Sequence, residues 1–219
     1  MDYTQNEGEE GQSGIGQPAE QEKQAKPKKE LQFKLYRLLL EKYADLINEH
    51  ETRTIGEIKG LVNADDLTIQ SILADFKKDG FDFQAGYLLV AEQVFQLVAR
   101  EIDYVDPEIN LNYWLTAKEV FSLKIGDDED LAVFLCSLLF GLGDEKAAVV
   151  IAELNNLRTH AFVATEFNEK FFILDPSQQH GFHDFSGTKE EALQKYSFKK
   201  AKIKRFLYKF NHSTYEQFM

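Results

Sequence analysis

Three short segments of the chain carry residue types that act in acid–base and nucleophilic chemistry. The segment "GDDED" at 126–130 comes directly before an apolar helical pattern, so Asp128 lies at a predicted helix start. His160 follows in "THAFV", and Asp175 follows in "ILDPS", at the end of the next predicted strand. The order is therefore a helix N-terminus, an imidazole on a strand and a carboxylate that can fix the tautomer of that imidazole.

This order resembles the active site of the transglutaminase-like, papain-type cysteine enzymes. Their thiol lies at a helix N-terminus in a "GDCED"-like motif, their His in an "HAW"-like motif and their Asp in an "LDPT"-like motif. The helix N-terminus lowers the pKa of the thiol, because its unpaired N–H groups favour the thiolate. The resemblance covers about residues 86–180 and includes Trp114. It implies the family's fold, with Asp128, His160 and Asp175 at the three triad positions.

The sequence departs from this family at the nucleophile, because Asp128 stands where the family has cysteine. A carboxylate at a helix N-terminus is stabilised by ~0.3–1 kcal/mol, but it is a poor nucleophile toward amides. The triad is then vestigial, and we expect a catalytically inactive domain that acts as a protein- or peptide-binding scaffold. Trp114 would support its groove, and an acidic rim of Asp127, Glu129 and Asp130 would favour a basic partner.

The single cysteine is a second candidate nucleophile. Cys136 lies eight residues into the predicted helix, which is ~12 Å along the helix axis from Asp128. Its neighbours are Phe and Leu, and free cysteine in such surroundings behaves as a small hydrophobic residue. We therefore expect Cys136 to be buried, and a residual cysteine-peptidase activity is the minor alternative.

An enzyme of altered chemistry is a further alternative. Two carboxylates and an imidazole, here Asp128, Asp175 and His160, are suitable ligands for a divalent metal and could support metal-assisted hydrolysis. Nothing else in the sequence requires a metal, so we expect neither a metal site nor another cofactor. His160 also has a structural interpretation, as a hydrogen-bonding residue on a strand.

Composition excludes several classes of function. The net charge of −12 argues against binding to nucleic acid or to anionic membranes. One cysteine in 219 residues excludes an intramolecular disulfide framework and a multi-cysteine zinc site. The N-terminal residues do not read as a signal peptide, and no run approaches the ~18 apolar residues of a membrane span. We expect a cytoplasmic protein, and the sequence leaves its oligomeric state open.

Helical patterns come first along the chain and strand-like patterns follow, which predicts the α+β class. Leu35, Leu39, Tyr43 and Leu46 share one helical face, and the segment "TIGEIKGLV" begins with a capping box. Further on, the helix that starts near Asp128 should pack on an antiparallel sheet. Its strands are expected at 147–153, 160–167 and 170–175, with one more at 199–210 near a sheet edge.

Three regions follow from these patterns. Residues 1–29 contain few apolar side chains and are expected to form a disordered tail. Residues 30–80 should form a small helical region, and residues 81–219 a transglutaminase-like domain.

Overall fold

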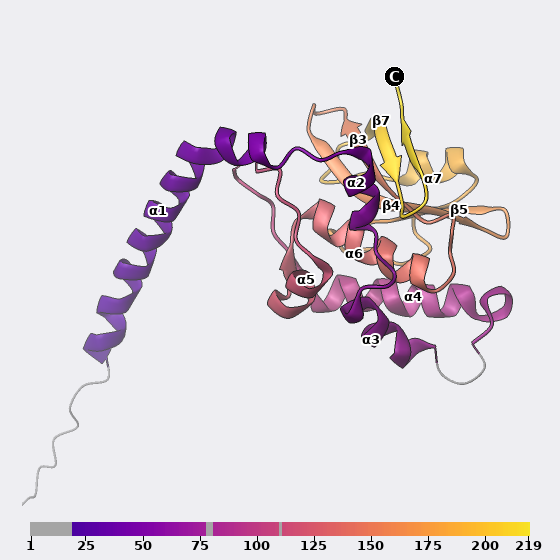
Figure 1. Cartoon of the computed structure of the whole chain (residues 1–219), viewed down its shortest axis with the longest axis horizontal. Helices are drawn as coiled ribbons and strands as arrows, with labels where there is room; N and C mark the ends of the chain where they lie inside the picture. The colour runs from indigo at the N-terminus through magenta and orange to yellow at the C-terminus, as the bar shows by residue number, and fades with distance from the viewer. Residues whose placement is uncertain (1–18, 78–80, 110) are drawn as a thin grey trace, which may run out of the picture. The chain divides into compact units, whose positions relative to one another are not determined.

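The computed structural model describes residues 19–77, 81–109 and 111–219. Two compact units are present, Met1–Leu46 and Ile47–Met219. The first contains most of helix α1 (Ala19–His50), and the second contains all the other elements (Figure 1). The boundaries expected near residues 30 and 81 stay predictions.

The expected disordered tail needs correction after residue 18, and residues 1–18 lie outside the described part. Residues 19–29 form the beginning of α1. They are mainly Ala, Glu, Gln and Lys, which are strong helix formers even where no apolar face is available. The low hydrophobicity of this stretch was therefore a poor guide to its local conformation.

Six helices build the larger unit around one central helix. They are α2 (Ile55–Leu61), α3 (Leu67–Phe76), α4 (Phe83–Glu101), α5 (Ala117–Leu123), α6 (Asp128–Gly141) and α7 (Lys189–Lys195). Helix α6 packs on α3, α4 and α5 on one side and on the sheet on the other (Figure 1). Its residues from Asp130 to Leu139 are all buried, which explains why its sequence is apolar nearly all round. A capping box starts α2, as the sequence predicts, and capping boxes also start α5 and α7.

The main sheet has six antiparallel strands in the order β6-β5-β4-β3-β7-β8. Their bounds are β3 Ala148–Leu154, β4 Thr159–Phe167, β5 Lys170–Leu174, β6 Ser186–Gly187, β7 Ile203–Phe210 and β8 Tyr215–Gln217. The three central predicted strands and the α+β class are thus confirmed. β7 lies near a sheet edge as expected, with only the short β8 paired to its outer side. A separate two-stranded parallel ladder joins β1 (Asp103–Tyr104) to β2 (Ile125–Gly126), directly before α6.

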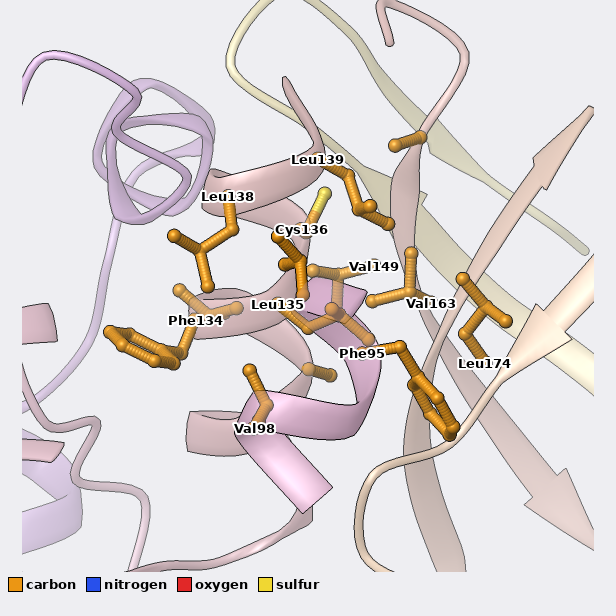
Figure 2. Packing of buried hydrophobic residues seen from close by; sticks show 14 of the residues in the cluster. Phe95, Val98, Phe134, Leu135, Cys136, Leu138, Leu139, Val149, Val163 and Leu174 are labelled. Atoms are coloured by element: carbon orange, nitrogen blue, oxygen red, sulfur yellow. The ribbon is translucent and has the colours of Figure 1, made fainter. Parts of the chain in front are cut away.

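The core lies between α6 and the sheet. Leu135 and Leu139 of α6 share one buried cluster with Val149 of β3 and Val163 of β4 (Figure 2). Side chains of this size each contribute about 1.5–3 kcal/mol when fully buried. This packing fixes the start of α6 beside strand β4, which sets the geometry of the site.

Candidate functional site

The site is built at the N-terminus of α6. Asp127 is the N-cap: its side chain accepts from the backbone N–H of Asp130 at 3.0 Å, and the side chain of Asp130 accepts from the N–H of Asp127 at 3.3 Å. This reciprocal cap satisfies two otherwise unpaired N–H groups. Asp128 is the first residue of the helix, so the cap and the buried body of α6 together fix where its carboxylate points.

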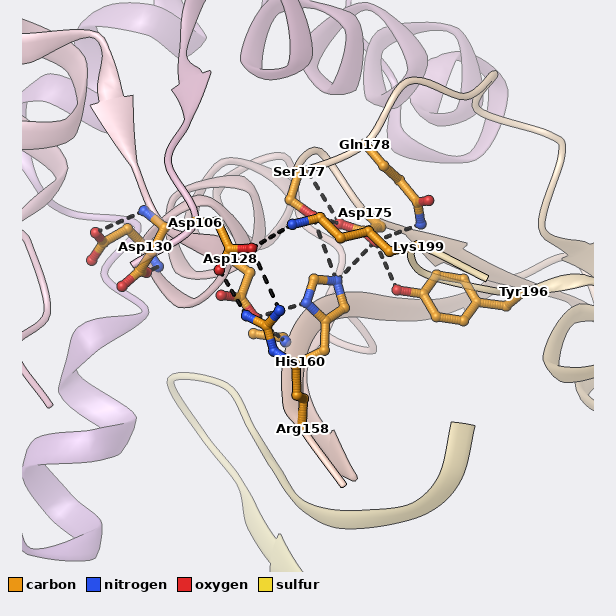
Figure 3. Close-up of polar contacts among 12 residues, drawn as sticks. Asp106, Asp128, Asp130, Arg158, His160, Asp175, Ser177, Gln178, Tyr196 and Lys199 are labelled. Atoms are coloured by element: carbon orange, nitrogen blue, oxygen red, sulfur yellow. Dashed lines mark hydrogen bonds and ion pairs between the residues drawn. The ribbon is translucent and has the colours of Figure 1, made fainter. Parts of the chain in front are cut away.

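Asp128, His160 and Asp175 meet in one hydrogen-bonded row. The Nδ1 of His160 lies 2.8 Å from Oδ2 of Asp128, and its Nε2 lies 3.0 Å from Oδ2 of Asp175 (Figure 3). Oδ2 of Asp128 also accepts from the backbone N–H of Ala161 at 2.7 Å. The order along the chain thus brings together the three positions that the family resemblance indicates, with a carboxylate on each side of the imidazole.

Asp175 is held by a dense set of donors. Tyr196 donates its hydroxyl at 2.7 Å, and Gln178 donates its side-chain amide at 2.7 Å. Ser177 donates its hydroxyl at 2.5 Å and its backbone N–H at 3.1 Å. Burial alone would raise the pKa of Asp175, but its bonds to His160 and to these donors hold the pKa below the usual value. Asp175 is therefore a fixed anion in the protein interior.

His160 carries a proton on each ring nitrogen at neutral pH. Burial alone would lower its pKa, but the hydrogen bonds and charges of Asp128 and Asp175 raise it to about 9. A doubly protonated imidazole donates to both carboxylates and has no lone pair with which to accept a proton. In this form His160 cannot act as a general base, because a base must be unprotonated at the working pH.

The ring of His160 is covered as well as paired. Phe198 stacks on it with ring centroids 3.6 Å apart and ring planes 14° apart, and His160 is 2% exposed. Phe198 begins a tight turn in which Lys199 and Lys200 both have positive φ, 47° and 71°, a conformation that non-glycine residues rarely adopt. Nearby, Asp106 pairs with Lys199 and also with Arg158 at 2.7 Å. The face of the imidazole is thus closed to a substrate.

Two of the remaining acidic residues, Asp127 and Asp130, accept hydrogen bonds from the backbone around the start of α6. Oδ1 of Asp130 accepts from the backbone N–H of Leu115 at 2.7 Å, and Asp127 is engaged in the cap. Burial, and then the like charges nearby, raise the pKa of Glu129 to about 8 and that of Asp130 to about 7. Burial is also the main cause that raises the pKa of Asp127. Part of the negative charge read from the sequence is therefore neutralised by bound protons near pH 7.

Trp114 and Cys136 lie away from the row. Trp114 is 8% exposed, lies with its ring 5.8 Å from that of Phe210 and donates its indole N–H to Asn112 at 3.0 Å. Cys136 is fully buried in the apolar cluster shown in Figure 2. Burial, and secondarily the charge of Asp144, raises the pKa of its thiol well above the usual range. A buried thiol that resists ionisation is not an activated nucleophile.

The three central residues cannot all bind one metal ion. Asp128 and Asp175 face opposite nitrogens of the same ring, so an ion on either nitrogen is separated from the far carboxylate by the width of the imidazole. Within 19–77, 81–109 and 111–219, no group of three or more His, Cys, Asp or Glu side chains could hold a metal. The geometry therefore does not support the metal-assisted alternative.

A pocket of about 540 Å³ opens beside Asp175. Its lining includes Tyr104, Arg100 and Phe95 from one side and Ser177 and Gln178 from the other. Ser177 and Gln178 thus contact both the pocket and Asp175. No sequence pattern singled out Ser177 and Gln178, or Tyr196 and Phe198. Only Ser177 was within reach of sequence reasoning, because it closes the "LDPS" segment.

Residues 112–203 match the sequence profile of the CEP76 peptidase-like domain. No curated protein matches the chain. LapG of Legionella pneumophila is similar in structure, with a TM-score of 0.49 at 16% identity over 81% of this chain and 87% of that one. Its calcium-bound form gives a TM-score of 0.49 at 17% identity over 68% and 75% of the two chains.

No helix in the described part of the chain is both long and apolar enough to cross a membrane.

The profile match covers α5, α6 and the strands β3 to β6, which are the elements that carry Asp128, His160 and Asp175. The central helix, the antiparallel sheet and the order of these residues agree with that match. The fold of this part of the chain is transglutaminase-like, of the papain-like peptidase type.

Proposed function

We propose that this chain is a catalytically inactive transglutaminase-like domain that acts as a protein- or peptide-binding scaffold in the cytoplasm. The observation that carries the proposal is the carboxylate of Asp128 at the α6 N-terminus, 2.8 Å from Nδ1 of His160. The family places its thiol at this helix position. Asp128 cannot form the acyl intermediate that a thiolate forms, because its attack would give an anhydride rather than a thioester.

Two further observations support inactivity. His160 is protonated at neutral pH, since the two flanking carboxylates raise its pKa to about 9. Phe198 stacks on the ring and covers it. An active site of this type needs an imidazole that exchanges a proton with both nucleophile and leaving group. Under this proposal, the hydrogen bonds among Asp128, His160 and Asp175 instead hold the start of α6 against β4 and the end of β5.

A peptide segment is the proposed partner, and the pocket beside Asp175 is its proposed place of binding. The pocket combines apolar walls from Phe95 and Phe182 with polar groups from Ser177 and Gln178, a mixture typical of recognition sites. A basic segment remains the proposed class of partner. Its attraction would come from the net charge of −12 rather than from Asp127 or Asp130, which are bonded within the protein.

The test of inactivity restores the missing group. In Asp128→Cys the new thiol lies at a helix N-terminus beside His160, so its pKa should fall and iodoacetamide should alkylate it rapidly near pH 7. Adding His160→Ala should slow that alkylation. Ser122→Cys, on the exposed side of α5, is the matched control for an ordinary surface thiol.

Wild-type protein should hydrolyse no fluorogenic peptide and incorporate no amine into a glutamine substrate. Turnover by the wild type that disappears in His160→Ala would overturn the proposed inactivity. The binding part is tested separately, by binding of a basic peptide library at low and high salt. Binding that is unaffected by Ser177→Trp, which fills the pocket, would remove the pocket from the proposal.

A further inference from the structure

Helix α1 presents apolar side chains that the site and the fold do not use. Each of the large residues in question is between 41% and 72% exposed, and they are Leu31, Phe33, Leu35, Tyr36, Leu38, Leu39, Leu40, Tyr43 and Leu46. They gather within 31–46, in the first of the two compact units. Exposed apolar surface of this extent on a soluble protein marks an interaction site.

The centre of this surface is a seam, which we define as Leu35, Leu39, Tyr43 and Leu46. These residues lie at i, i+4, i+8 and i+11 and therefore on one side of the helix. The opposite side carries ion pairs within the helix, Lys34 with Glu30 at 2.8 Å and Arg37 with Glu41 at 2.9 Å. The polar side therefore has its own partners, and the seam is the side that needs one.

The charges of the segment favour a second copy of this chain. Residues 31–50 contain three basic side chains and three acidic ones, so their formal charge is zero within a chain of −12. Two copies repel each other through the remainder of the chain, but no net charge opposes contact at this helix. An apolar seam is also complementary to itself, as a twofold-symmetric contact requires.

The available area agrees with a stable dimer. Large apolar side chains offer roughly 150–200 Å² each when fully exposed. Phe33 and Leu40 lie too far round the helix to join a contact centred on the seam, and the other seven large apolar residues of α1 are about half exposed. Each copy therefore presents about 600 Å² to this contact, and two copies together about 1,200 Å², which is at the lower end of the range of specific interfaces.

We propose that α1 is a self-association helix, and that the seam of one copy packs against the seam of a second copy. This inference goes beyond the proposed function and does not rest on it. Pairing would join two transglutaminase-like domains through their N-terminal helices. The partner is identified by its chemistry alone: a charge-balanced helix with the same apolar side.

The experiment is sedimentation velocity on the full chain over about 1–100 μM, a range that covers micromolar dissociation constants. The wild type should sediment as more than one copy at the upper concentrations. Leu39→Lys/Tyr43→Lys should shift it to a monomer, with a dissociation constant weakened by at least about a hundredfold. Glu30→Gln/Glu41→Gln is the matched control, because it changes the net charge by the same two units on the opposite side of the helix.

A second variant distinguishes loss of association from loss of helical structure in α1. Leu39→Ala/Tyr43→Ala truncates the two central residues of the four in the seam but keeps a strong helix former at both positions, so circular dichroism should show unchanged helix content. It should also weaken association. A wild type that stays monomeric at every concentration overturns the proposal, as would dissociation by the control or association that the Ala variant leaves intact.

Discussion

Removal of the Asp128 carboxylate tests the structural role of the row most directly. In Asp128→Ala, His160 loses the acceptor for its Nδ1–H, and Ala161 loses the acceptor for its backbone N–H. A hydrogen bond to a charged group contributes about 1.5–3 kcal/mol, and a buried N–H left without a partner costs about 1–3 kcal/mol. His160 keeps its hydrogen bond to Asp175, so the combined loss of the two contributions should lie near its lower end. We expect the free energy of unfolding to fall by about 3 kcal/mol, a large share of the usual 5–15 kcal/mol.

Urea unfolding followed by tryptophan fluorescence measures this loss. Asp106→Ala is the matched control, since Asp106 also has two partners, the cations Arg158 and Lys199, but lies nearer the surface. Exposed pairs contribute about 0–1 kcal/mol, so the control should lose far less than Asp128→Ala. Nuclear magnetic resonance should also show the pKa of His160 falling from about 9, because one of its two carboxylates is gone. Equal losses in the two variants, with an unchanged His160 pKa, would refute the reasoning.

Three further predictions concern other parts of the domain. Cys136 should react slowly with a thiol reagent in native protein and quickly in urea, since it is fully buried; rapid stoichiometric labelling of native protein would contradict this. Gly141→Ala should lower the free energy of unfolding by about 1–3 kcal/mol, because its new methyl group would collide with Leu73, and an unchanged urea midpoint would count against that contact. Stability should decline as pH rises from about 6 to 9, because the pKa values of Glu129, Asp130 and His160 are raised to about 8, 7 and 9 in the folded state. Between its ordinary and its raised pKa, each group keeps a proton in the folded state that it has released in the unfolded state, so rising pH favours unfolding until that proton dissociates. Thermal unfolding across this pH range measures the decline, and a midpoint that rises would show that the raised values are wrong.

The fold could be predicted because its strongest local signals agree with its packing. Helix α6 follows a glycine and an acidic cap, and its apolar residues really are buried on every side. The strands β4 and β5 flank Asn168 and Glu169, which adopt the positive φ values of a two-residue hairpin turn. The alternation of apolar and polar residues could not show that β8 pairs with the outer side of β7, because a strand of three residues is too short for an alternating pattern to be recognised.

The packing of Phe198 over His160 could not be predicted from the sequence, because the turn that carries Phe198 lacks the usual turn residues. Phe198 reaches His160 through a turn whose two central residues, Lys199 and Lys200, lie in the left-handed region. Propensity rules assign such turns to Gly or Asn, so two lysines carry no turn signal. Tyr196 likewise joins Asp175 from more than twenty residues away, and no spacing in the sequence connects them. Local sequence patterns predicted that Asp128, His160 and Asp175 come together. The position of Phe198 over His160 depends instead on packing between distant segments.

The position of Asp128 has a consequence for how such a domain keeps its shape. An active enzyme of this family pairs a thiolate with an imidazolium only in one protonation state, and the pair must break during turnover. Asp128 supplies a carboxylate at the same helix start, and its Oδ2 lies 2.8 Å from Nδ1 of His160. The buried cation then has two anionic partners and the buried anion Asp175 has four donor residues. Asp128, His160 and Asp175 thus form a hydrogen-bonded link between the start of α6, strand β4 and the end of β5.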